Sequence, residues 1–168
     1  MNDSGDDGFD IRNADGDADM DLVRELFREY QDWLGVDLCF QDFDDELAAL
    51  PGLYTPPAGR LYLVNDKAAG ALVGCAALKP LAPGVCEMKR LYVRDAWRGR
   101  GLGRRLAELC VVEARRTGYR EICLDTLAHL TAARALYADM GFRETAPYYD
   151  NPLDGVTFMT LPLVPDAD

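Results

Sequence analysis

The sequence contains a single histidine, His129, and its five cysteines are scattered, with no CxxC pair. Protein metal sites usually draw several His or Cys ligands from short, regular spacings, so no metal cofactor is expected. An odd number of widely spaced cysteines is typical of reduced thiols rather than of a disulfide framework. These shortages favour a cytoplasmic protein that works without a metal.

Long apolar segments are also lacking, although hydrophobic residues make up 49% of the chain. No apolar run approaches the roughly 20 residues that a membrane-spanning helix needs. The opening residues, MNDSGDDGFD, contain neither a basic nor an apolar segment, so no secretory signal is expected. We expect one domain at 9–163, preceded by a disordered acidic N-terminus at 1–8 and followed by a short tail at 164–168.

Positive charge is scarce, because 18 Lys and Arg face 29 Asp and Glu, giving a formal net charge of -11. Such a field repels phosphate backbones and anionic membrane surfaces, so neither nucleic acids nor membranes are expected partners. The arginines nevertheless gather around residues 90–105, beside several glycines. This concentration favours a local anion site, while a solvated arginine face is the alternative interpretation.

Hydrophobic periodicity predicts an α/β domain with the order β-α-α-β-β-β-α-β-α-β-β. Asp19 is expected to cap the first helix, which Gly35 ends. A mixed sheet with helices on its faces is the natural packing for this order. Strands are predicted at 9–14, 60–66, 70–81, 85–95, 120–127, 142–149 and 155–163, and helices at 19–34, 41–50, 102–117 and 131–141.

Residues 90–106, RLYVRDAWRGRGLGRRL, lead from an alternating strand through a glycine-rich turn into a helix. The first N–H groups of a helix lack internal acceptors and, with the helix dipole, form an anion site. Glycines at such a turn allow close approach of a phosphate. The spacing fits neither a Walker A loop nor a G-x-G-x-x-G fingerprint. The turn therefore predicts a pyrophosphate site, and a glycine turn without a ligand remains the alternative.

The same segment resembles the acyl-CoA-binding motif of the GNAT superfamily of N-acyltransferases, R/Q-x-x-G-x-G/A, with Arg98, Gly101 and Gly103 at its defining positions. Further along, TAARALYADMGF resembles the A-x-x-L-Y-x-x-x-G-F helix of that superfamily. With the element order, the resemblance covers about residues 9–163. It implies a mixed, mostly antiparallel twisted sheet of about seven strands flanked by about four helices, with acetyl-CoA as the acyl donor.

The resemblance also implies where acetyl-CoA binds. Backbone amides of the turn would hold its pyrophosphate, and the strand before the turn, splayed from its neighbour, would pair with the pantetheine arm. The chain departs from the superfamily at Leu130, where an Asn often contacts the cofactor, and the neighbouring Thr131 could replace that contact. The implied cofactor-binding residues are Leu91, Tyr92, Val93, Arg98, Gly99, Arg100, Gly101, Leu102, Gly103 and Arg104.

Two side chains match catalytic positions of the superfamily. Glu87 lies eleven residues before Arg98, where several members place a general base; its alternative role is a structural carboxylate paired with Lys89 or Arg90. Tyr137 matches the tyrosine that protonates the leaving thiolate, and its alternative role is packing on the sheet. His129 lies beyond these motifs and is expected to be structural.

The acceptor is expected to be a small primary amine that enters between the N-terminal helices and the loop PYYDNPLDG. Two other readings remain open: a protein or peptide N-acetyltransferase, which would need an open groove, and a non-catalytic acyl-CoA-binding module. Dimers are common in the superfamily, so a homodimer is a further expectation. The candidate acceptor-binding residues are Tyr30, Trp33, Tyr148, Tyr149 and Asn151, with Asp150 beside them.

Overall fold

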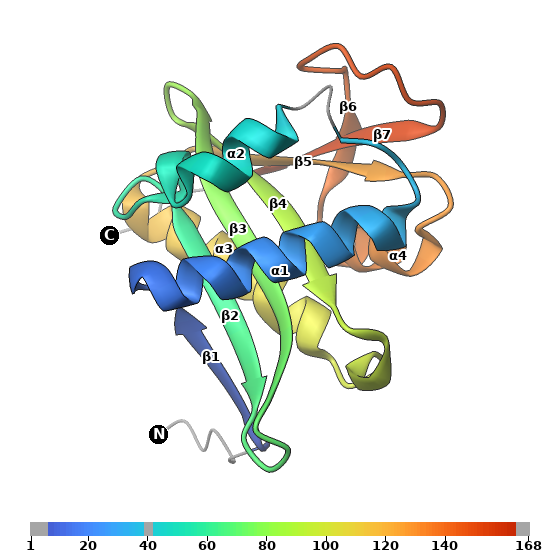
Figure 1. Cartoon of the computed structure of the whole chain (residues 1–168). Helices are drawn as coiled ribbons and strands as arrows, with labels where there is room; N and C mark the ends of the chain where they lie inside the picture. Colours follow the sequence, from blue (N-terminus) through green and yellow to red (C-terminus); the bar gives the residue numbers. More distant parts are fainter. Residues whose placement is uncertain (1–6, 39–41, 164–168) are drawn as a thin grey trace, which may run out of the picture.

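The computed structural model describes residues 7–38 and 42–163 of the chain (Figure 1). The disordered N-terminus expected at 1–8 lies largely outside the described residues, as do the tail at 164–168 and residue 41, the predicted start of the second helix. Within the described ranges, no helix combines the length and the apolar character needed to cross a membrane.

Seven strands form one sheet, in the order β1-β2-β3-β4-β5-β7-β6. Neighbouring strands are antiparallel except for β4 and β5, which are parallel. The mixed, mostly antiparallel sheet expected from the sequence is therefore confirmed. The strands are β1 (Phe9–Asn13), β2 (Arg60–Asp66), β3 (Ala71–Ala82), β4 (Val85–Val93), β5 (Glu121–Leu127), β6 (Arg143–Thr145) and β7 (Val156–Pro162).

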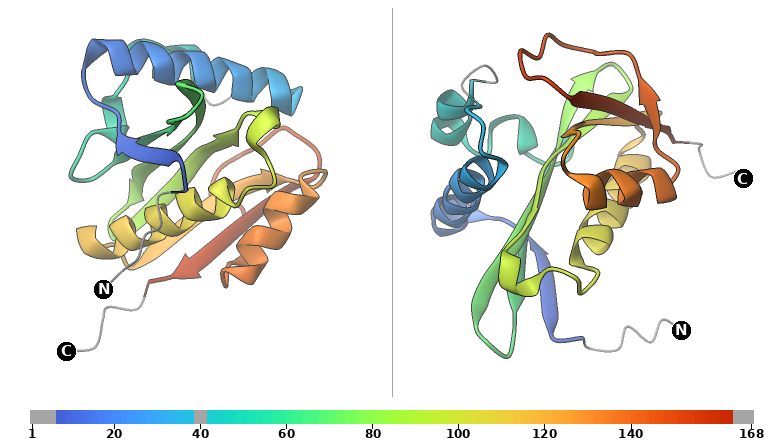
Figure 2. Two further views of the ribbon diagram at one scale, coloured as in Figure 1. Left: turned by 90° about the horizontal axis from the view of Figure 1, so that it is seen from below. Right: turned by 90° about the vertical axis from the view of Figure 1, so that its right-hand side faces the viewer.

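Helices cover both faces of the sheet, as the two views in Figure 2 show. One face packs against α1 (Gly16–Leu34) and α2 (Phe43–Ala49), and the other against α3 (Leu102–Thr117) and α4 (Thr131–Asp139). Two short 3-10 helices, η2 (Gly52–Tyr54) and η3 (Asp95–Trp97), lie in connections. Each face has its own apolar core, so side chains that alternate along a strand enter different cores.

The first helix begins earlier than the sequence predicts, at Gly16, so the expected N-cap role of Asp19 is wrong. Instead, the Asp19 carboxylate accepts hydrogen bonds from the Arg12 guanidinium and from the backbone N–H of Asp15. The bond from Arg12 is the main reason why the pKa of Asp19 is lowered. Asp19 thus joins β1 to the first turn of α1.

The strand predicted at 142–149 is shorter than expected, because β6 spans only Arg143–Thr145. Proline lacks the N–H that a sheet ladder requires, so Pro147 favours an end to pairing at this point. The following residues turn back over the sheet, where the hydroxyls of Tyr148 and Tyr149 donate hydrogen bonds to carboxylates on β4 and β5. The loop 146–155 therefore lies against the α1 and α2 side of the sheet.

The parallel pair β4 and β5 is joined only at its start, where Val85–Glu87 lies opposite Glu121–Cys123. Further along, β4 continues with β3 and β5 with β7, so the two strands diverge (Figure 1). The register between β3 and β4 also shifts near Arg90, whose φ of 58° is unusual for a non-glycine residue. This opening between diverging strands positions the candidate site.

Candidate active site

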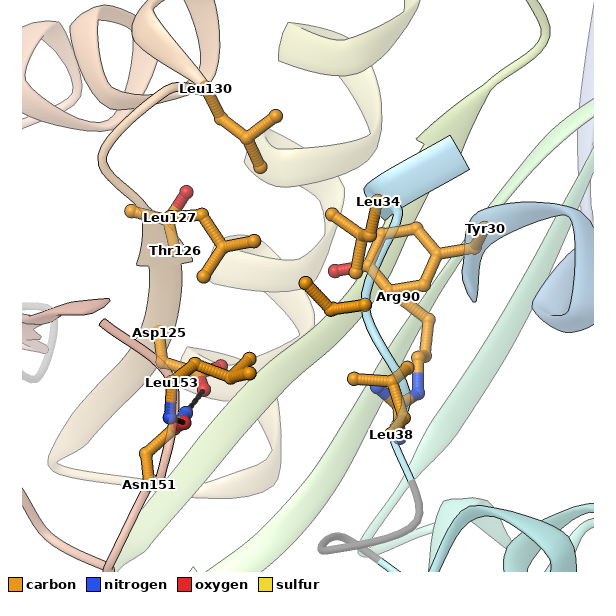
Figure 3. Close-up of a pocket in the computed structure, with 11 residues that line it drawn as sticks. Tyr30, Leu34, Leu38, Arg90, Asp125, Thr126, Leu127, Leu130, Asn151 and Leu153 are labelled. Atoms are coloured by element: carbon orange, nitrogen blue, oxygen red, sulfur yellow. Dashed lines mark hydrogen bonds between the residues drawn. The ribbon is translucent and has the colours of Figure 1, made fainter. Parts of the chain in front are cut away.

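Two adjoining pockets occupy the opening between β4 and β5, and they share Tyr30, Arg90, Asp125, Thr126 and Leu130. We call the first the gap pocket. Its other lining residues are Trp33, Met88, Lys89, Leu91, Leu124, Ala133 and Tyr137. We call the second the loop pocket (Figure 3). Its other lining residues are Leu34, Val36, Leu38, Leu127, Asn151 and Leu153.

The glycine turn ends at the N-terminus of α3, close in sequence to the end of β4. Gly101 is the N-cap, with a φ of 78°, and its carbonyl accepts the N–H of Arg105. No described side chain caps the helix start, so the amides of residues 102–104 lack partners within the helix. A Cβ at Gly99 or Gly101 would meet open space, so the turn leaves room for a bulky anion.

Arginine side chains of the turn are engaged by the protein itself. Arg98 donates to the Val93 carbonyl at 2.9 Å, and its guanidinium lies 4.6 Å from the centre of the Trp33 ring. Arg104 pairs with Glu108 and Asp139. These contacts hold the turn in place, so the backbone amides rather than these two side chains provide the anion-binding groups.

Tyr137 comes from α4, is buried, and lines the gap pocket together with Leu91 of β4. Its ring makes an edge contact with Phe142, at 5.8 Å between ring centres. Burial raises the pKa of the Tyr137 hydroxyl well above that of a free phenol. The hydroxyl therefore keeps its proton at neutral pH, on a residue that lines the gap pocket.

Glu87 is 2% exposed, and both of its carboxylate oxygens have partners. Oε1 lies 3.6 Å from Lys79 Nζ and 3.7 Å from Lys89 Nζ, while Oε2 accepts a 2.6 Å hydrogen bond from the Tyr148 hydroxyl. Burial lowers the pKa of Lys89, and the charge of Glu87 opposes that shift. Because Lys89 lines the gap pocket, Glu87 is linked to the pocket wall through this lysine.

The sequence motifs do not mark Asp125 and Arg90 as site residues, although both line the two pockets. Asp125 accepts a hydrogen bond from the Tyr149 hydroxyl and another from Asn151, which Figure 3 shows. Arg90 is 4% exposed and pairs with Glu46 of α2 at 3.2 and 3.3 Å. For Asp125, the available signal was a charged residue within the largely apolar strand EICLDTL, because charged side chains are rarely buried unless they are paired.

The residues predicted to bind the acceptor do surround the opening, but in different ways. Tyr30 lines both pockets, and burial raises its pKa to about 12. Trp33, 42% exposed, lies at the gap pocket, and Asn151 lines the loop pocket. Tyr148 and Tyr149 instead attach the loop to the sheet. Asp150 and His129 are exposed.

Leu130 occupies the position where the superfamily often has Asn. It lines both pockets and contributes an apolar side chain to their walls. Thr131, the residue considered as its replacement, is the exposed first residue of α4. Among residues 7–38 and 42–163, no group of three or more His, Cys, Asp or Glu side chains could hold a metal ion. Cys75, Cys86, Cys110 and Cys123 are free and buried.

A diverging parallel strand pair beside an uncapped, glycine-led helix start defines the class of acyl-CoA-dependent N-acyltransferases. The chain belongs to the acetyltransferase (GNAT) family, whose sequence model matches residues 20–142. It is an N-acetyltransferase that uses acetyl-CoA as cosubstrate and an amine as acceptor.

Similar proteins support this assignment. An uncharacterized N-acetyltransferase of Schizosaccharomyces pombe is 43% identical over 85% of this chain and 88% of its own length. The IAA acetyltransferase of Azospirillum brasilense is 33% identical over 85% of this chain and 92% of its own length. The Salmonella typhimurium protein yncA, solved with its cofactor acetyl-CoA, superimposes with a TM-score of 0.69 at 25% identity, over 96% of this chain and all (100%) of that one.

Proposed function

We propose that the enzyme acetylates the primary amine of a small molecule in the cytoplasm. The observation that carries this proposal is the loop 146–155, which is folded onto the sheet. Through Asn151 and Leu153 it lines the same pocket as Leu34 and Leu38 from the opposite side (Figure 3). A pocket bounded from both sides suits a small acceptor better than a peptide. The four free, buried thiols fit a reducing compartment.

The residues present fit acetyl-CoA. The amides of residues 102–104 point away from the start of α3 and suit its diphosphate. The edge of β4 that β5 leaves unpaired, over residues 91–93, offers main-chain groups to the pantetheine arm. Acetyl-CoA supplies an activated acetyl thioester. Leu91, just after the distorted Arg90, lines the gap pocket, and its N–H would stabilise negative charge that develops on the acyl oxygen.

The reaction needs a proton transfer before the attack and another when the thiolate leaves. An alkylamine with a pKa near ~10.4 is protonated at neutral pH and must lose a proton before it attacks. Glu87 accepts that proton, directly or through water, and Lys89 links it to the pocket. The amine nitrogen forms a bond with the acyl carbon, the carbon–sulfur bond breaks, and the departing thiolate takes the proton of the Tyr137 hydroxyl. The newly bonded nitrogen loses its second proton to solvent, Glu87 releases the proton that it accepted, and Tyr137 regains a proton from solvent.

Thiol release tests the proposal. Acetyl-CoA binding is measured by calorimetry, and CoA release is followed with a panel of small amines, amino acids and peptides. Release with small amines is the expected result. Tight binding without turnover of any acceptor would identify a non-catalytic acyl-CoA-binding module. Turnover of peptides alone would identify a protein N-acetyltransferase.

Tyr137→Phe is expected to lower kcat between about tenfold and a hundredfold, with little change in acetyl-CoA affinity. General acid catalysis typically contributes ~10²–10⁴-fold, and a thiolate leaves more easily than an alkoxide, so the effect is expected at or below the lower end of that range. Because burial raises the pKa of Tyr137, the wild-type rate should not fall through ionisation of this group up to about pH 9. Steady-state rates at several pH values check both points, and an unchanged rate in the variant would assign Tyr137 to packing on Phe142.

A further inference from the structure

Polar and apolar side chains share both walls of the loop pocket. Asp125 and Asn151 lie on the same wall as Leu153, while Arg90 lies on the opposite wall, near Leu38 (Figure 3). A molecule held at Asp125 would therefore meet branched aliphatic side chains on the walls around it. These aliphatic lining residues are Leu34, Val36, Leu38, Leu127, Leu130 and Leu153.

The positive charges at the two pockets are already matched by the fold. Arg90 forms two contacts with the Glu46 carboxylate, and its guanidinium lies 5.9 Å from the Tyr30 ring centre and 5.3 Å from that of Phe43. Lys89 is paired with Glu87. An incoming carboxylate would have to compete with these partners.

Asp125 is held in a different way. Its carboxylate accepts hydrogen bonds from the Tyr149 hydroxyl and from Asn151 Nδ2, at 3.5 Å in the latter case. Both donors are neutral and orient the carboxylate, and the nearby Lys89 ammonium, whose closest carboxylate is that of Glu87, also interacts with the Asp125 charge. Asn151 is itself fixed, since its Nδ2 also donates to the Tyr149 hydroxyl at 2.8 Å and its Oδ1 accepts the Leu153 N–H at 2.9 Å. The pocket thus presents an oriented anion.

The register places this anion next to the reaction site. Cys123 of β5 lies opposite Glu87 of β4, so Asp125, two residues further along the parallel strand, reaches the level of Lys89 and Arg90. Asp125 lines both pockets. A nitrogen bound to it therefore faces the gap pocket, where Leu91 and Tyr137 lie.

We propose that the acceptor is a primary amine with a single positive charge and a compact, branched apolar body. Asp125 binds its nitrogen, and the six aliphatic side chains of the loop pocket surround its body. This inference rests on the proposed function. An amino acid would add a carboxylate whose natural partners, Arg90 and Lys89, are already paired. A diamine would place its second charge among leucines.

Binding without turnover tests the inference. Isopentylamine, leucine and 1,5-diaminopentane share similar bodies but carry one positive charge, an added carboxylate and a second positive charge, respectively. Each is titrated by calorimetry into the enzyme saturated with CoA, which carries no acetyl group. Isopentylamine is expected to bind at least about tenfold more tightly than either other compound. Equal or tighter binding of leucine or diaminopentane, or no binding of isopentylamine, would overturn the inference.

Asp125→Asn keeps the shape of the side chain and removes its charge. It is expected to weaken isopentylamine binding by about tenfold to a hundredfold, since hydrogen bonds to charged groups are the strong ones. Glu144→Gln, at an exposed carboxylate on β6, removes one negative charge elsewhere and should leave binding unchanged. Unchanged binding in Asp125→Asn would exclude Asp125 as the nitrogen-binding group.

A second variant keeps the inference testable if Asp125→Asn does not fold. Leu153→Ala should reduce the preference for isopentylamine over methylamine, which has no apolar body, while leaving methylamine affinity alone. An unchanged preference would exclude the loop pocket as the binding site of the body. Thiol release measured in parallel distinguishes failure of this inference from failure of the proposed function. If other amines are turned over while these binding tests fail, only the acceptor class is wrong, and the N-acetyltransferase activity is unaffected.

Discussion

Replacing Gly103 with valine is expected to weaken acetyl-CoA binding by about a hundredfold while the fold stays intact. Gly103 lies in the first turn of α3, and a Cβ there would meet only Leu136 Cδ2, at an ordinary 4.0 Å. The branched side chain would instead stand beside the amides of residues 102–104. A hydrogen bond to a charged group contributes ~1.5–3 kcal/mol, so loss of about two such bonds gives at least this effect.

Calorimetry with acetyl-CoA measures this change, and thermal unfolding checks the fold. Gly103→Ala is the matched control, because the acyl-CoA-binding motif accepts alanine at this position. Alanine also favours a helix over glycine by up to ~1 kcal/mol, so this variant should unfold no earlier than the wild type. Wild-type affinity in the valine variant would show that the start of α3 does not hold the diphosphate.

Glu87→Gln is expected to reduce kcat at neutral pH by roughly 10²–10³-fold, the range of a lost general base. The loss should shrink as pH rises, because a larger fraction of the amine is then deprotonated in solution. Rates at pH 7 to 10 measure the effect. Glu144→Gln is the control, since it removes an exposed carboxylate on β6, away from the pockets. Equal wild-type and Glu87→Gln rates over the whole range would leave Glu87 a purely structural role.

The same variant should also be less stable, by about 3 kcal/mol at neutral pH, because it removes one partner of a buried ion pair. Burial lowers the pKa of Lys89 below its usual 10.5, so the unfolded chain binds more protons there than the native state in the interval below 10.5. Stability therefore rises with pH across that interval. Without Glu87 the pKa of Lys89 falls further, so the stability gap should narrow as pH approaches 10.5. Urea unfolding at pH 7 and 9.5 checks this trend.

Local patterns sufficed to predict much of the fold. Period-two segments gave the β2–β3–β4 meander, and the glycines of residues 99–103 marked the start of α3. These features depend on neighbours in the chain. The end of β6 at Thr145 was not foreseen, since the tyrosines that follow look strand-forming and leave the sheet for contacts with Glu87 and Asp125. Such contacts join residues far apart in sequence.

The site was predictable only in part for the same reason. The motifs pointed to Glu87 and Tyr137, and both lie at or next to the gap pocket. The charge environment of Glu87 was not predictable in full, because Lys79 reaches it across the β3–β4 register, which the sequence does not state. The sequence offers Arg90 as a partner of Glu87, yet Arg90 pairs with Glu46, a residue 44 positions away. Ion pairs between a strand and a helix that covers the sheet can be identified only in the folded structure.

Tyr148 and Tyr149 are adjacent residues, yet their hydroxyls are bonded to different strands, one to Glu87 of β4 and the other to Asp125 of β5. Those are the two strands that separate. The dipeptide therefore links β4 to β5 and limits the distance between these two strands. Loss of either hydroxyl would alter the dimensions of the entrance for both reactants at once.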